Sequence, residues 1–61
     1  MIDPIVQNQI LLVRATGRTN MFDVRMVSQI AKEMELDELV EFLKLRSNRG
    51  VYAHFILTGE A

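Results

Sequence analysis

The stretch TNMFDVRMVSQIAKEMELDELVEFL, residues 19–43, decides the fold because it predicts two helices joined by a turn. Asn20 and Asp23 have the spacing of a helix N-cap, with a side-chain acceptor at each end of one turn. The residues that follow are polar on one side of a helix and apolar on the other. The apolar positions at helical spacing are Val24, Val27, Ile30, Ala31 and Met34.

A shift of hydrophobic phase divides this stretch in two. If the first helix continued, its apolar stripe would pass through Asp37, Glu38 and Glu41. Burying unpaired carboxylates costs far more than a short turn, so the chain must turn near residues 35–37, with Asp37 as the cap of the next helix. We therefore expect the two helices to form an antiparallel hairpin. The apolar positions of the second helix are Leu36, Leu39, Val40 and Leu43.

The segment before the hairpin predicts another helix, over residues 4–16. Asp3 can cap its start, Pro4 suits the first helical position, and Gly17 can take the left-handed conformation that ends a helix. Apolar residues recur along it at helical spacing, from Ile5 to Val13.

The segment after the hairpin is harder to interpret. The helix that starts at Asp37 is expected to run to about Ser47, and residues 47–50 resemble a loop. Residues 51–57, VYAHFIL, suit a strand or a helix, but a lone strand would have no pairing partner. We therefore expect a short fourth helix that ends at Gly59. The predicted fold is all-α, with three helices plus a short C-terminal helix in a single domain, residues 1–61.

Composition favours an oligomer. A domain of 61 residues without cysteine is near the lower limit for independent folding, and 49% of its residues are apolar. Some of these apolar side chains should remain exposed, and self-association would cover them.

Charge and hydropathy restrict the other partners. Seven Lys and Arg oppose eight Asp and Glu, a formal charge of −1, which argues against strong non-specific attraction to nucleic acid. The longest apolar runs, Ile10–Val13 and Phe55–Leu57, are too short to span a bilayer, and no signal peptide is visible. We expect a cytoplasmic protein without membrane contact.

Catalytic groups are scarce. His54 is the only histidine, and without cysteine it has no partner for a nucleophile–base pair or a zinc site. Its segment is apolar, so a structural or solvent-facing role is favoured. Acidic residues crowd the turn near residues 35–37, where they suit helix caps and a solvated face. The sequence predicts no enzyme, no cofactor and no metal site.

Two weaker signals leave alternatives open. Arg18 and the amides near Asn20 precede a helix and could hold a small anionic ligand, although the glycine pattern of a nucleotide loop is missing. Residues 27–44 resemble a helix-turn-helix, which would make the protein a small DNA-binding regulator. Its second helix, however, begins with Asp37 and Glu38, whose charges would repel phosphates.

A set of Met and aromatic residues is the strongest functional candidate. Their burial within so short a chain is the least assured, and such side chains are enriched in interface cores. The alternative is that they complete the core of the monomer. The residues are Met21, Phe22, Met26, Phe42 and Tyr52.

The segments TNMFD at residues 19–23 and FILTGE at residues 55–60 carry a resemblance. With the intervening helical pattern, the chain resembles a family of short proteins of unknown function from Gram-positive bacteria and their phages. The resemblance covers roughly residues 5–60 and implies a cytoplasmic accessory protein, encoded by a phage or prophage, without implying an activity or cofactor.

The expected function is therefore a non-enzymatic protein–protein interaction module. Its partners would be a second copy of itself, as a homodimer or larger oligomer, and an unidentified protein. The candidate interaction surface combines Arg18 and Asn20 with the Met and aromatic set.

Overall fold

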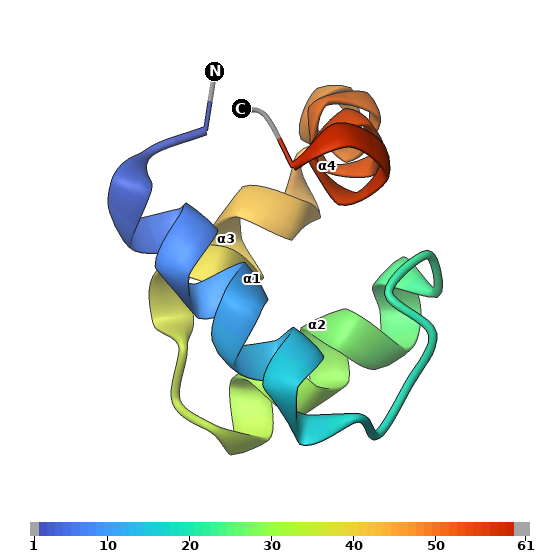
Figure 1. Ribbon diagram of the computed structural model, residues 1–61. Coiled ribbons are helices and arrows are strands. Elements are labelled where there is room, and N and C mark those ends of the chain that lie inside the picture. The colour runs from blue at the N-terminus through green and yellow to red at the C-terminus, as the bar shows by residue number, and fades with distance from the viewer. Residues whose placement is uncertain (1, 60–61) are drawn as a thin grey trace.

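The computed structural model describes residues 2–59 and has four helices there (Figure 1). They are α1 (Pro4–Thr16), α2 (Val24–Glu33), α3 (Asp37–Lys44) and α4 (Arg46–Thr58). Within the described part of the chain there is no strand, and α2 and α3 pack against each other as the predicted helical hairpin. The helix α3 is the centre of the fold because it contacts all three of the others.

The first helix has the predicted bounds at both ends. The Asp3 carboxylate accepts a hydrogen bond from the Ile5 amide at 2.8 Å, which satisfies one of the free donors of the first turn. Gly17 follows the helix with φ 64°, and its amide donates to the Arg14 carbonyl. The local signals in the sequence were therefore sufficient for α1.

The second helix begins at Val24, and its N-cap is Asp23 rather than Asn20. The Asp23 carboxylate accepts from the Met26 amide at 3.3 Å. Asn20 instead forms a turn of its own: its side chain accepts from the Phe22 amide at 2.8 Å, and its carbonyl from the Asp23 amide at 2.9 Å. Both residues bind amides as acceptors, but in two successive motifs.

The turn between α2 and α3 lies where the shift of phase predicts it. The Leu36 amide donates to the Ala31 carbonyl at 2.8 Å and the Glu35 amide to the Lys32 carbonyl at 3.1 Å, which is the Schellman pattern. Glu35 has φ 61° there, a conformation that usually belongs to glycine. The prediction that Asp37 caps α3 is wrong: Leu36 holds that position without a side-chain hydrogen bond, and Asp37 is the first helical residue.

The predicted loop at residues 47–50 is wrong, because α4 starts at Arg46 and has 13 residues, as many as α1. The chain changes direction at Leu45 alone, which has an extended backbone. The Asn48 side chain donates to the Phe42 carbonyl at 3.0 Å, and the Arg49 Nε donates to the Leu43 carbonyl at 3.4 Å. These side chains satisfy the free carbonyls at the end of α3, so no loop is needed.

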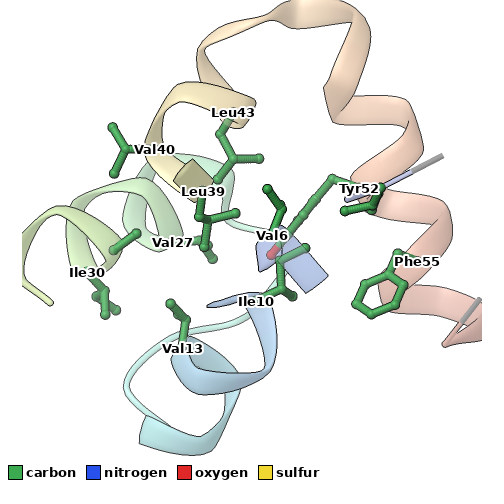
Figure 2. Packing of buried hydrophobic residues seen from close by; sticks show 12 residues of the cluster. Val6, Ile10, Val13, Val27, Ile30, Leu39, Val40, Leu43, Tyr52 and Phe55 are labelled. Carbon is green, nitrogen blue, oxygen red and sulfur yellow. The ribbon is translucent and has the colours of Figure 1, made fainter. Parts of the chain in front are cut away.

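Buried apolar side chains from all four helices, together with Ile2, form a single core (Figure 2). Figure 2 shows Tyr52 reaching from α4 across this core toward the other helices. The buried residues are Ile2, Val6, Ile10, Val13, Val27, Ile30, Ala31, Leu39, Val40, Leu43, Tyr52 and Phe55.

At two backbone positions, those of Glu35 and Gly50, a different residue type would make the fold more stable. Glu35 is left-handed, so Glu35→Gly relieves the clash of its Cβ, and Gly50 lies inside α4 with open space around its Cα. We expect Glu35→Gly and Gly50→Ala each to raise the free energy of unfolding by about 0.5–1 kcal/mol. Urea denaturation at constant m-value measures this, and a lower midpoint for either variant would contradict it.

Candidate functional site

The predicted Met and aromatic residues separate into two groups in the structure. Phe22 and Met26 are exposed, with 51% and 38% of their surface in solvent. Met21 and Phe42 are half-buried and pack against the core. Only Phe22 and Met26, at the start of α2, are therefore open to a partner.

Tyr52 is not a surface residue, and this part of the prediction is corrected. Its side chain is fully buried, and its hydroxyl donates to the Met21 carbonyl at 2.6 Å. Burial raises the pKa of Tyr52 to about 12, because the phenolate would lose its water. The aromatic ring completes the core, and its hydroxyl fixes the connection between α1 and α2.

The polar groups around Arg18 and Asn20 already have hydrogen-bond or ion-pair partners within the chain. Arg18 forms an ion pair with Glu33 of α2 at 3.3 Å, with about half of each side chain exposed. Exposed pairs of this kind contribute little stability. The amides of Phe22 and Asp23 both donate to Asn20, so neither points at a free ligand position.

The start of α3 is capped from a distance by Gln9 of α1. Its side-chain oxygen accepts from the Leu39 amide at 2.8 Å, and its side-chain nitrogen donates to Glu38 at 2.7 Å. The second bond, together with the Glu38 backbone amide, holds the pKa of the Glu38 carboxyl below its usual value. Nothing in the local sequence marks Gln9 for this role, because the two residues it joins are about thirty positions away.

The surface around the N-termini of α1 and α3 is acidic. Asp3, Asp37, Glu38 and Glu41 line a shallow groove of about 410 Å³ together with Ile5 and Val6. In a helix-turn-helix, α3 would enter the major groove, and these carboxylates would meet phosphates there. The geometry therefore gives α3 the wrong charge for reading DNA.

The outward side of α1 is an apolar face that the sequence analysis missed. Ile5, Leu11 and Leu12 are 58%, 48% and 44% exposed, and Asn8 and Ala15 on the same side of the helix are exposed as well. None of these five side chains is charged. We call them the α1 face. The signal was present in the sequence: residues 10–13 are apolar without interruption, which is more than one side of a helix can bury.

A groove between α1 and α4 adjoins the α1 face at Leu11. Its volume is about 270 Å³, and Phe55 and Ile56 of α4 lie along its opposite wall. Ile10 also lines it, and Gln7 and Arg14 add polar groups. Leu11 therefore joins the α1 face to a groove of mixed character, apolar at Ile10, Phe55 and Ile56 and polar at Gln7 and Arg14.

Within residues 2–59, no three His, Cys, Asp or Glu side chains are placed to hold a metal ion. His54 is exposed on α4, away from the core. In that same range, no helix has both the length and the apolar character needed to cross a bilayer.

Comparison with protein families gave one result that bears on the whole chain. The profile of a domain of unknown function, DUF5049, matches residues 2–60. The chain belongs to this family. Comparison with curated proteins and with solved structures gave no match. Membership in DUF5049 confirms that the chain belongs to a family of unknown function. Glu60, the last residue of the FILTGE segment, lies outside the described part of the structure.

Proposed function

We propose that this DUF5049 protein is a non-enzymatic interaction module that forms a homodimer through the α1 face. One observation carries the proposal: α1 is apolar on both sides. Val6, Ile10 and Val13 are buried in the core, while Ile5, Leu11 and Leu12 point outward into solvent. Exposed apolar residues on the outward side of a helix whose other side is already buried suit a contact with another surface.

The absence of charge on the α1 face makes a second copy a suitable partner. In a symmetric dimer each face meets itself, so any charge would lie near its own copy. The uncharged residues Asn8 and Ala15 at the middle and end of this face avoid that repulsion. The α1 face can therefore pack against its own copy without repulsion between like charges.

The area that a stable dimer must bury indicates how far the interface has to extend beyond α1. A standard interface buries about 800 Å² per partner, roughly a fifth of the 4188 Å² exposed by this chain. The outward side of α1, about 20 Å long, is too narrow to supply this area alone. The adjoining groove, lined by Phe55 and Ile56 and by the cation Arg14, extends the surface. The proposed interface therefore includes both α1 and α4, with Arg14 as a charged residue outside the α1 face.

The biological setting follows from the resemblance rather than from the fold. We infer an accessory protein of a Gram-positive bacterium or its phage, acting in the cytoplasm. Phe22 and Met26 are the exposed residues that we assign to an unidentified partner protein. Neither residue belongs to the α1 face or lines the groove between α1 and α4, so we expect self-association to leave them available.

We expect Leu11→Lys to weaken dimerisation by about 10- to 100-fold, because it places a charge, twice by symmetry, inside an apolar contact. Sedimentation equilibrium over a range of protein concentrations measures the dimer fraction. Leu57→Lys is the matched control: Leu57 is 73% exposed on α4, and the change in net charge is the same. Phe22→Ser should also leave the dimer intact.

Two results would refute the homodimer. One is a wild-type protein that sediments as a monomer at millimolar concentration. The other is an equal loss of association in Leu11→Lys and Leu57→Lys, which would show that charge alone, and not the α1 face, governs association. Circular dichroism of each variant establishes that the helices are retained.

A further inference from the structure

A basic groove lies between the outward side of α2 and the start of α4. Its volume is about 580 Å³. Arg25, Ser28, Gln29 and Lys32 of α2 line one wall, and Arg49 of α4 lines the other. Val24 and Leu43 supply the apolar part of the lining. No carboxylate of residues 2–59 lines this groove, although the chain as a whole is slightly acidic.

Although the net charge of the chain is only −1, the fold places acidic and basic side chains in separate grooves. The groove beside α3 gathers four carboxylates, whereas the α2–α4 groove gathers three cations. Of these cations, Arg25 and Lys32 form no ion pair with any described residue. Their charges are therefore available to an anion from solution.

Arg49 is held in position for such a contact. Its Nε donates to the Leu43 carbonyl, which fixes the side chain against the end of α3. Its two terminal NH₂ groups have no partner among residues 2–59. A guanidinium anchored in this way loses little freedom when it binds an oxyanion through two hydrogen bonds.

We propose that the α2–α4 groove binds the phosphate backbone of nucleic acid. Arg25 and Lys32 are seven residues apart on one side of α2, about 10 Å along the helix axis. Phosphates of one strand are about 3.4 Å apart along the duplex axis, so this wall spans about three phosphates when α2 lies parallel to that axis. Hydroxyl and amide side chains such as Ser28 and Gln29 are regular phosphate donors between cations.

This chemistry favours nucleic acid over an acidic peptide. The cations lie on two helices along an open groove, and neutral donors lie between them, which fits a regular chain of phosphates. The proposal differs from a helix-turn-helix, because α2 and α4 make the contact and the acidic α3 does not. It is also independent of the α1 face, which has none of these residues.

Fluorescence anisotropy with a labelled 20-base-pair duplex of arbitrary sequence tests the proposal. Three phosphate contacts predict a slope of log K against log salt of about −2.7, which is a loss of about 40-fold in affinity between 50 and 200 mM salt. Arg25→Gln and Lys32→Gln should each reduce the affinity by about 3- to 10-fold and the slope by about 0.9.

Lys44→Gln is the matched control, because Lys44 is an exposed cation that lines neither this groove nor the groove between α1 and α4, and its loss changes the net charge equally. Its affinity should equal that of the wild type. A Lys44→Gln variant that is weakened as much as Lys32→Gln would overturn the proposal, as would the absence of binding at 50 mM salt. Tighter binding to a labelled poly-glutamate peptide than to the duplex would also overturn it. Circular dichroism confirms the fold of each variant.

Discussion

Tyr52→Ala is expected to lower the free energy of unfolding by about 3–5 kcal/mol, the largest effect of any single change described for this chain. The substitution empties the centre of the core and leaves the Met21 carbonyl without its donor. The whole stability expected for 61 residues is only about 3–9 kcal/mol. Thermal unfolding followed by circular dichroism should therefore show a protein that is largely unfolded at 37 °C.

Two further variants test how much of this loss of stability comes from the Tyr52 hydroxyl and how much from burial of its ring. Tyr52→Phe keeps the ring and removes only the hydroxyl, so we expect a loss of about 1–2 kcal/mol. Phe22→Ala removes an aromatic ring that is half exposed, so it should cost less than about 1 kcal/mol. If Tyr52→Phe proved as harmful as Tyr52→Ala, the contribution assigned to packing would be wrong.

The pKa of Tyr52 gives an independent check. The folded value is about 12 and the ordinary value 10.0, so the unfolded chain loses this proton first as the pH rises. The stabilisation is therefore complete below pH 10 and is lost between pH 10 and about 12. Denaturation midpoints of the wild type should fall more steeply over this range than those of Tyr52→Phe.

Gln9→Ala is expected to lower the free energy of unfolding by about 1–3 kcal/mol, because it leaves the amide at the start of α3 without an acceptor. No side chain of the adjoining turn can replace Gln9, since α3 has no local side-chain cap. Urea denaturation measures the loss. Gln29→Ala is the control: it is an exposed helical glutamine, and its side chain makes no hydrogen bond within residues 2–59.

The pKa of the Glu38 carboxyl also tests the position of the Gln9 side chain, because the Gln9 side-chain nitrogen donates to this carboxyl. In the wild type its pKa lies below the ordinary value of 4.5, mainly because the Gln9 side chain donates to it. Stability from this group is therefore present above pH 4.5 and is lost as the pH falls through the lowered pKa. In Gln9→Ala the Glu38 pKa, followed by NMR titration, should rise, and an unchanged value would contradict the bond.

Local signals in the sequence predicted most of the fold. Asp3, Pro4 and Gly17 marked both ends of α1, and the shift of phase located the turn before α3. These signals suffice because a cap or a helical stripe depends on residues within one or two turns. The start of α4 was missed for the opposite reason: Asn48 and Arg49 have loop-like composition, yet their side chains bind carbonyls that only the folded α3 presents.

The candidate surfaces were less predictable from the sequence. Phe22 and Met26 are exposed, as the interaction hypothesis requires, while Tyr52 is buried because α4 turns it toward the core. The α1 face and the basic groove each depend on how helices are rotated against one another. The hydrophobic pattern predicts which side of a helix faces the core only when the opposite side is clearly polar. The outward side of α1 carries Ile5, Leu11 and Leu12, so it is not clearly polar.

The hydrogen bonds from the Leu39 amide to Gln9 and from the Tyr52 hydroxyl to Met21 each join residues about thirty positions apart, and the two spans overlap. A cut in the backbone anywhere between residues 21 and 39 would place the two ends of both bonds on different fragments. Each fragment would then lack one partner of both hydrogen bonds and part of the apolar core. Pieces of this chain should therefore be unstructured when separate and should regain helicity together when mixed, which makes the protein a natural candidate for a split reporter.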